Sequence, residues 1–567
     1  MRIKEHKCFL EEYNIIKSIM LSSFALTTTF VLLFHLCRAD VFLNWFNDQH
    51  KEIIDNPVYL SVQGSIPSYV SGDLIRVGPS IANTDLKNYS NFLDSFGRIS
   101  KWTLKGNNTV EYMSSLIKSS VYNASFSNNL SDISRHIFQE QTIPKTSFGK
   151  FDLSLMDNTD VNVFKFPKKP EILAMTDFHN MNTIDLKSLR TVGNVVFQDN
   201  NTDIPTGTLF SGSHPGTHID KTTGETFLVN WLGSLAAGGF HFYIYKMDSN
   251  KKRRIIGYYK LEQQPYSVHS IGVSDGLATV IIGPVPLSSY KTAVNLCLTC
   301  CATDKIGKEA TQILVFNVEG ESLSKNTPPV AVVNIPPEES FFVFHYLNHV
   351  IRETIVSMDV CVYDSMDGVI GEYTLGNIET LRNVDKRNSM PYNCDHIKRI
   401  EINVEAEEVI AQTDLPMVDT KGNIHRIELA SINPKKWGTN ACYAYGMSYH
   451  IGGSSRYEDM GIVKMDLCTA YKVSTGEFVS NTSTVTYFHE TNIYVGEPIF
   501  VPRPGDNNTE DDGVLLVVSK NGTSNKTSLL VIDAIDMVVL ARIEGPFHTP
   551  FEFHGVFMED PELYMSA

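Results

Sequence analysis

The chain has 567 residues, of which 42% are hydrophobic, so it can bury a large core and shows no compositional sign of disorder. Its formal net charge is −16, and basic runs such as Lys251–Arg254 are short. Because nucleic acids and anionic membrane surfaces are bound through extended basic stripes, this composition excludes nucleic acid as the main partner and argues against electrostatic membrane binding.

Residues 1–39 predict a targeting segment. Basic residues precede an apolar stretch from Ile19 to Leu36, and the Cys-Arg-Ala triplet at 37–39 fits the small-residue pattern of a cleavage site. A cleaved signal peptide and an uncleaved anchor both remain open, since about 17 apolar residues is the lower limit for crossing a bilayer. In either case we expect residues 40–567 to enter the secretory pathway, as a secreted or an endoplasmic-reticulum-membrane-associated protein.

Asn-x-Ser/Thr sequons recur along the chain and agree with a secretory glycoprotein. They lie at Asn88, Asn107, Asn123, Asn129, Asn200, Asn481, Asn507, Asn521 and Asn525.

Nine cysteines do not predict a disulfide framework in a chain of this length. Cys297 and Cys300 have a spacing known from zinc and redox sites, but no second pair with metal spacing accompanies them. Lipidation or membrane contact of this cluster, which includes Cys301, is the favoured interpretation. The sequence leaves pairing open for Cys361, Cys394, Cys442 and Cys468.

From about residue 57 onward the chain shows short strands in close succession. Segments such as Asp73–Val77, Thr226–Asn230 and Leu277–Ile282 are rich in Val, Ile, Thr and aromatic residues and are bounded by turn residues. Many short strands indicate a sandwich, a barrel or a propeller, and a chain of this length favours the propeller. No linker divides residues 40–567, so a single all-β domain is expected.

Four of the 17 histidines stand out by their surroundings. They are His214 in Gly-Ser-His-Pro-Gly, His269 in Pro-Tyr-Ser-Val-His-Ser, His345 in Phe-Phe-Val-Phe-His-Tyr, and His554 in Phe-Glu-Phe-His-Gly.

These four segments, in this order, resemble the ligand motifs of the carotenoid cleavage oxygenase family, including its animal branch of β-carotene oxygenases and retinoid isomerase. The stretches Gly72–Pro79, Leu93–Phe96, Tyr443–Gly446 and Gly496–Val501 fit the same family, and the resemblance spans roughly residues 57 to 567. It implies a seven-bladed β-propeller with a cap of loops and short helices over the active-site face.

The resemblance also implies that His214, His269, His345 and His554 hold iron(II). Imidazole nitrogen suits iron(II), and four protein ligands around a six-coordinate ion leave positions open for O₂. Carboxylates implied behind the histidines are Asp177, Glu428 and Glu497, which would fix each ring and supply negative charge.

Two departures from the family pattern concern this site. Asp177 stands where the family usually has the longer Glu, so we expect it to fall short of its histidine. The family's His-Pro-x-x-Asp is two residues longer here, ending at Asp220, so His218 is an alternative to the favoured His214. His349, four residues after His345, is expected to be a neighbour and not a ligand.

The function implied is cleavage of a double bond in a carotenoid or apocarotenoid by O₂, to give aldehydes or ketones. Long polyenes are costly to hold in water, so substrate should arrive from a lipid membrane surface through an exposed apolar patch. Leu232–Phe240 and Ala293–Ala302 are the candidate segments, with buried strand and loop as the other interpretation.

Two alternatives remain open at this stage. A retinyl ester isomerohydrolase would use the same metal without net oxidation. A non-catalytic, glycosylated polyene-binding or retinoid-binding propeller would account for Asp177 and for the altered loop of the first histidine.

Overall fold

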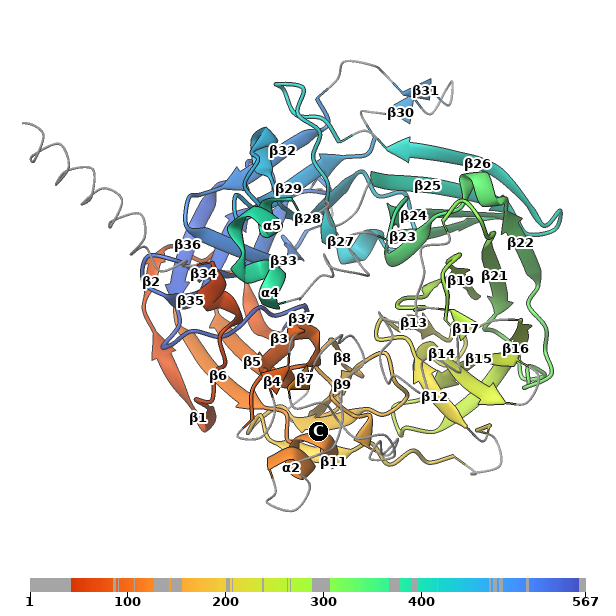
Figure 1. Cartoon of the computed structure of the whole chain (residues 1–567), viewed down its shortest axis with the longest axis horizontal. Coiled ribbons are helices and arrows are strands. Elements are labelled where there is room, and N and C mark those ends of the chain that lie inside the picture. The colour runs from red at the N-terminus through yellow and green to blue at the C-terminus, as the bar shows by residue number, and fades with distance from the viewer. Residues whose placement is uncertain are drawn as a thin grey trace, which may run out of the picture.

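A computed structural model describes residues 42–559, apart from 85–87, 90, 107, 127–141, 144–154, 200–203, 206, 237–238, 263, 266, 288–305, 367–377, 390–395, 416, 469–470, 473–476, 479–482 and 506–508. The described chain is almost entirely β-structure, arranged as seven antiparallel sheets around one axis (Figure 1). The predicted seven-bladed β-propeller is therefore confirmed.

The blades are numbered here in chain order, and their strands are given in the order in which they pair. Blade 1 contains β1 (Ile53–Leu60), β6 (Val110–Leu116), β5 (Phe96–Lys105), β3 (Ser71–Ile81) and β37 (His554–Glu559). Blade 2 contains β11 (Thr191–Asn194), β10 (Asn182–Asp185), β9 (Glu171–Met175) and β8 (Asn162–Phe164). Blade 3 contains β12 (Thr208–Ser211), β14 (Thr226–Ala236), β15 (Gly239–Met247) and β16 (Arg253–Leu261), with β13 (Gly216–Ile219) also on β14.

Blade 4 contains β18 (Gly272–Ser274), β19 (Leu277–Ile282), β21 (Thr311–Asn317) and β22 (Ala331–Ile335). Blade 5 contains β23 (Phe342–Arg352), β24 (Ile355–Tyr363), β25 (His396–Asn403) and β26 (Glu408–Leu415). Blade 6 contains β27 (Glu428–Ile432), β28 (Tyr443–Ser448), β29 (Gly461–Asp466) and β32 (Val485–His489). Blade 7 contains β2 (Val62–Gly64), β36 (Val539–Glu544), β35 (Lys526–Asp533), β34 (Gly513–Asn521) and β33 (Ile493–Pro502).

Three two-stranded sheets lie outside the blades. They pair β4 (Asn88–Tyr89) with β7 (Thr142–Ile143), β17 (Gln264–Pro265) with β20 (Pro286–Leu287), and β30 (Tyr471–Lys472) with β31 (Glu477–Phe478).

The ring is closed by strands exchanged between its first and last blades. The late strand β37 pairs with β3 in blade 1, with His554 opposite Val77, and the early strand β2 pairs with β36 in blade 7. Red and blue segments accordingly meet on one side of the ring in Figure 1. Backbone hydrogen bonds therefore join the two ends of the propeller in two places.

The strands are apolar on both faces because both faces of a blade are covered by other blades. In β34, Leu515 and Val517 belong to one hydrophobic cluster, whereas Val514, Leu516 and Val518 belong to another. All five side chains are buried. A strand buried on both faces is therefore apolar at successive positions and does not alternate between apolar and polar residues.

Short helices supply the described part of the predicted cap. Trp45 lies 4.9 Å from Phe551, ring centre to ring centre, which places η1 beside the segment leading into His554. Leu381 of α4 shares a hydrophobic cluster with Phe42 and Trp45. These helices are η1 (Leu43–Phe46), α4 (Ile378–Arg382) and α5 (Val384–Asn388), whereas α2 (Ser120–Phe126) packs against Phe96 of blade 1.

Some predictions fall on parts of the chain outside the described residues, namely the leader at 1–39 and the cysteine cluster within Ala293–Ala302. No helix in the described ranges is both long and apolar enough to cross a bilayer.

A disulfide joins Cys442, just before β28, to Cys468, just after β29, with their Cα atoms 4.9 Å apart.

Candidate metal centre

Four histidines from four different blades meet at the axis of the propeller. His214 lies between β12 and β13, His269 lies just ahead of β18, His345 lies within β23, and His554 begins β37. Each histidine offers one ring nitrogen as a ligand atom, and these four nitrogens all lie within 4.8 Å of one another. Within the described part of the chain this is the one such group of histidine, cysteine and carboxylate side chains.

Backbone hydrogen bonds between inner strands bring the rings together. The amide of His214 donates to the carbonyl of His269 at 3.0 Å, and the amide of Ile271 donates to the carbonyl of His214 at 3.3 Å. The His214 ring then lies 4.0 Å from the ring of His554 and 4.9 Å from that of His345, measured between ring centres.

The three remaining blades each contribute a carboxylate to the same cluster. Asp177, just after β9 of blade 2, lies 2.9 Å from Nδ1 of His269. Glu428, the first residue of β27 in blade 6, lies 2.6 Å from Nδ1 of His345. Glu497 in β33 of blade 7 lies 2.8 Å from Nδ1 of His554. Each blade therefore supplies one of these seven histidine and carboxylate side chains.

The free ring nitrogens make this cluster suitable for a metal ion. A carboxylate on Nδ1 leaves Nε2 as the available donor of the same ring. Nε2 of His345 is buried and has no hydrogen-bond partner among the described residues, which is costly for a polar atom unless a ligand occupies the site. Four imidazoles suit iron, zinc, copper or nickel, so the donor set indicates a transition metal without selecting one.

The electrostatics of two histidines favour the neutral form, which is the form that binds a metal. Burial and the three neighbouring imidazoles hold the pKa of His214 well below its ordinary value. Burial likewise lowers the pKa of His554 to about 4, although Glu497 opposes this shift.

The pair formed by His345 and Glu428 behaves differently. Burial opposes ionisation of both groups, but their mutual attraction outweighs it, so the pKa of His345 is raised and that of Glu428 is lowered to about 2. In the metal-free protein the shared proton therefore resides on His345. A metal ion that binds at Nε2 would displace the proton that the cationic ring carries there and release it to solvent, while the proton on Nδ1 would stay in the hydrogen bond with Glu428.

The three carboxylates are held by different partners. Glu497 accepts a hydrogen bond from Nη1 of Arg76 at 2.5 Å, and Glu428 accepts one from the hydroxyl of Tyr363 at 2.5 Å. Asp177 accepts one from the backbone amide of Ser213 at 3.1 Å. Sequence reasoning missed the roles of Arg76 and Tyr363. A charged residue in the apolar strand Leu74–Val77 was the available signal for Arg76, because a buried arginine requires a partner.

The expectation that Asp177 falls short of its histidine is wrong. Both of its carboxylate oxygens lie within 3.0 Å of Nδ1 of His269. The backbone makes up for the missing methylene, because the carbonyl of Asp177 accepts from the amide of Ser211 and its side chain accepts from that of Ser213. These bonds draw the loop after β9 toward blade 3.

The two other histidines considered in the sequence do not join the cluster. His218 lies in β13 and stacks on Phe227 at 6.3 Å between ring centres. His349 is fully buried, with Nδ1 2.7 Å from the hydroxyl of Ser274 and Nε2 2.8 Å from that of Thr279. The structure thus places His214, and not His218, in the cluster.

Aromatic side chains border the histidines. The ring of Phe344 lies 5.4 Å from that of His269 and 5.5 Å from that of Tyr363. Phe553 precedes His554 directly, with 6.5 Å between the ring centres. The surroundings of the cluster therefore combine a polar inner set with apolar rings outside it.

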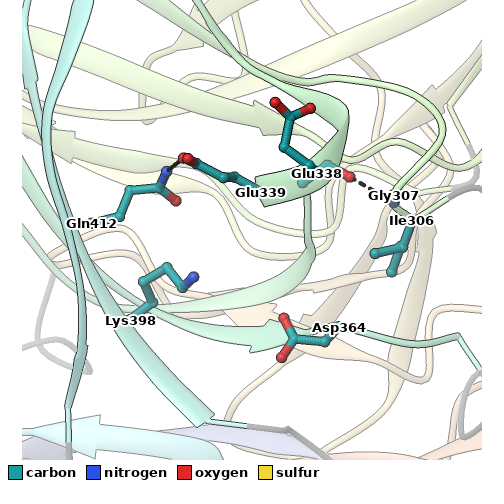
Figure 2. Close-up of a pocket in the computed structure, with 8 residues that line it drawn as sticks. Ile306, Gly307, Glu338, Glu339, Asp364, Lys398 and Gln412 are labelled. Atoms are coloured by element: carbon teal, nitrogen blue, oxygen red, sulfur yellow. Dashed lines mark hydrogen bonds between the residues drawn. The ribbon is translucent and has the colours of Figure 1, made fainter.

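Neither the pocket shown in Figure 2 nor the segment Leu232–Phe240 provides an apolar entrance to the histidine cluster. Figure 2 shows a pocket lined by polar groups such as Glu338, Lys398 and Gln412, which lies between the outer parts of blades 4 and 5 and contains none of the four histidines. Leu232 and Phe240, the described large side chains of the candidate segment Leu232–Phe240, are buried. The buried-strand interpretation therefore holds for them, while Ala293–Ala302 lies outside the described residues.

Comparison with known proteins gives a consistent result. A sequence model of the family described as "Retinal pigment epithelial membrane protein" matches residues 46–559. The chain is 23% identical over 549 residues to the mitochondrial carotenoid-cleaving dioxygenase of Homo sapiens, covering 88% of this chain and 87% of that protein. It is 23% identical over 567 residues to the beta,beta-carotene 15,15'-dioxygenase of Rattus norvegicus, covering 91% of each.

Solved structures share the fold. A glutamate-to-aspartate variant of Synechocystis apocarotenoid oxygenase has a TM-score of 0.71 and 21% identity, covering 92% of this chain and 98% of that one. The cobalt-substituted form of the same oxygenase has a TM-score of 0.71 and 20% identity over the same shares.

The acidity of Glu428 gives a prediction for the metal-free protein. Its pKa is about 2 in the folded state against 4.5 ordinarily, so its contribution to stability is complete above pH 4.5 and is lost as the pH falls toward 2. We expect the free energy of unfolding, measured in urea between pH 5.5 and pH 3.5, to fall less steeply with acid in the double variant His345→Gln/Glu428→Gln than in the parent protein, because the double variant removes both titrating groups of the pair. Equal slopes would contradict a depressed pKa at this position.

Proposed function

This chain belongs to the family of the retinal pigment epithelial membrane protein and the carotenoid oxygenases, and from that premise we propose that it is an iron(II)-dependent enzyme that cleaves a double bond of a carotenoid or apocarotenoid with O₂. The observation that carries the proposal is the meeting of His214, His269, His345 and His554 within 4.8 Å, with a carboxylate from each of the other three blades on Nδ1 of three of them.

The four imidazoles are compatible with iron(II), and the resemblance of the four histidine motifs to those of carotenoid cleavage oxygenases favours iron(II) over other transition metals. When bound, iron(II) would supply the site that activates O₂, because four ligands leave coordination positions open. The residues of this chain hold and orient the donors. Each hydrogen bond from Nδ1 to Asp177, Glu428 or Glu497 fixes one ring, and loss of such a bond typically costs 10–100-fold in metal affinity or activity.

The aromatic border suits an apolar, conjugated substrate. Phe344, Tyr363 and Phe553 can contact a polyene through their ring faces and edges and keep water from the reacting bond. The dioxygenases to which the chain is similar are named for carotenoid substrates, which agrees with this assignment. The polar pocket of Figure 2 is not proposed as the substrate site, because it would leave a polyene against carboxylates and an amine.

The non-catalytic alternative loses the two features that motivated it. Asp177 reaches His269, and His214 lies in the cluster in spite of the longer loop that follows it. An isomerohydrolase would share the metal centre, so only its reaction separates it from an oxygenase.

We further propose that the enzyme works on the luminal or extracellular side of the secretory pathway, with a lipid membrane surface as its source of substrate. The disulfide between Cys442 and Cys468 supports an oxidising compartment. Two sequon residues, Asn123 and Asn525, are exposed and can carry glycans without disturbing the core.

Iron binding by the four histidines is tested with substitutions of His345 and His349, which lie in the same strand, β23. His345→Ala should lower the iron content of purified protein roughly tenfold or more, because a donor to the ion is lost. The matched control is His349→Ala, which removes a buried histidine four residues away that contacts hydroxyls only. It should retain the iron. Equal iron content in His345→Ala and the parent protein would remove His345 from the site.

The reaction is tested by adding β-carotene or an apocarotenal to iron-loaded protein without O₂ and then admitting O₂. We expect the visible absorbance of the polyene to fall only after O₂ enters, with two carbonyl products detected by mass spectrometry. His345→Ala should show neither change. Conversion of a retinyl ester without O₂ would favour the isomerohydrolase, and binding of polyene without any product would favour the binding protein.

Glycans test the compartment. Protein expressed through a secretory cell should lose apparent mass on treatment with an N-glycosidase, and Asn123→Gln and Asn525→Gln should each reduce that loss. Asn525 accepts a hydrogen bond from Nζ of Lys520 through its side-chain oxygen, so its nitrogen stays available for a glycan. Material without any such shift would argue against the luminal side.

A further inference from the structure

Arg76 is a buried cation at the edge of the metal centre. It lies in β3 between Ile75 and Val77 and is 1% exposed. Its Nη1 donates to Glu497 at 2.5 Å, and its Nη2 donates to the carbonyl of Phe553 at 3.0 Å. Glu497 in turn contacts Nδ1 of His554 at 2.8 Å. Arg76 therefore acts on the proposed metal site through one carboxylate.

The other two carboxylates are held by uncharged partners. Asp177 accepts from the amide of Ser213, and Glu428 accepts from the hydroxyl of Tyr363. Among the described residues, Arg76 is the one arginine or lysine that contacts any of the three carboxylates. Blade 1 thus adds a full positive charge where other blades offer hydroxyl or amide groups.

From this arrangement we propose that Arg76 balances the charge of the centre for a divalent ion and so sets the ratio of ferric to ferrous iron. The inference rests on the proposed function, since it assumes that iron occupies the site. It makes Arg76 a positioning and electrostatic residue, because it acts on His554 through Glu497.

The charges of the contacting groups explain the effect. Four neutral imidazoles contribute none, and the carboxylates of Asp177, Glu428 and Glu497 contribute three negative charges. Two positive charges on a divalent ion and one on Arg76 equal them. A trivalent ion leaves one positive charge in excess, and uncompensated charge is unfavourable in a buried site. Arg76 therefore favours the ferrous form that reacts with O₂.

A purely structural role for Arg76 is the competing explanation. Its second nitrogen binds the carbonyl of Phe553, so its loss also loosens the segment that carries His554. A loosened segment predicts weaker iron binding and lower stability, whereas a charge effect predicts a change in the ferric-to-ferrous ratio. The two roles differ most clearly when charge is removed and then restored.

The experiment compares Arg76→Met, Glu497→Gln and the double variant, each loaded with iron. The ferric-to-ferrous ratio is measured by electron paramagnetic resonance at a fixed potential, with mediator dyes taking the one electron that iron(II) loses. Arg76→Met should raise the ratio about tenfold or more, the size expected for one unit charge several ångströms away in a protein interior. Glu497→Gln should lower it, and the double variant should return to within about threefold of the parent.

Two further variants separate charge from packing. Arg76→Lys keeps the charge and should keep a ratio close to that of the parent, even if some stability is lost. Arg98→Met removes another buried arginine of blade 1, which binds Ser80 and Ser114 and none of the three carboxylates. It should lower the melting temperature without changing the ratio. If Arg76→Met does not fold, Arg76→Gln removes the same charge and keeps a hydrogen-bond donor, so the same rise in the ratio is expected of it.

The outcomes distinguish this inference from the proposed function. Parent protein that binds no iron would overturn both. Parent protein that binds iron, with Arg76→Met at the same ratio or with a double variant further from the parent than either single variant, would overturn only the role of Arg76.

Discussion

The hydrogen bond between a carboxylate and Nδ1 of a histidine is the interaction on which the centre depends. A free imidazole can rotate and can carry its hydrogen on either nitrogen, whereas a carboxylate on Nδ1 fixes both and turns Nε2 toward the axis. Asp177, Glu428 and Glu497 do this for three of the rings, and each bond joins two different blades. The orientation of the donors is therefore a property of the closed ring and not of any one strand.

The sequence predicted those parts of the site whose chemistry is local. The residues around His345 form a short motif in one strand, so His345 could be recognised as a candidate ligand without a structure. The order of the four histidine motifs then indicated the family, and with it the propeller fold. The reach of Asp177 could not be predicted, because it depends on amides of Ser211 and Ser213 from the next blade. Arg76 was visible as a charge in an apolar strand, but its partner lies 421 residues away in the sequence.

The net negative charge of the protein disfavours contact with an anionic membrane, whereas the proposed apolar substrate would have to be taken from a membrane. A formal charge of −16 repels anionic headgroups, so contact with the proposed membrane source of substrate would have to come from apolar groups or from an anchor. Leu232 and Phe240 cannot supply that contact, since they are buried in blade 3. The aromatic rings of Phe344 and Phe553 lie beside the histidines, so in the proposed function they would contact the substrate at the metal centre and not at a membrane surface.

The strand that closes the propeller also carries a histidine, since His554 is the first residue of β37 and pairs with Val77 of β3. Detachment of that strand would remove one of the two pairings that close the ring and would break the metal centre in the same event. A tightly bound metal ion would then stabilise the pairing of β37 with β3, because an ion that binds only the closed ring opposes opening of the ring by mass action. Hydrogen exchange of the amides in β37 and β3 under native conditions would accordingly slow when metal binds. Removal of the metal by a chelator would make the pairing of β37 with β3 the first part of the protein to unfold.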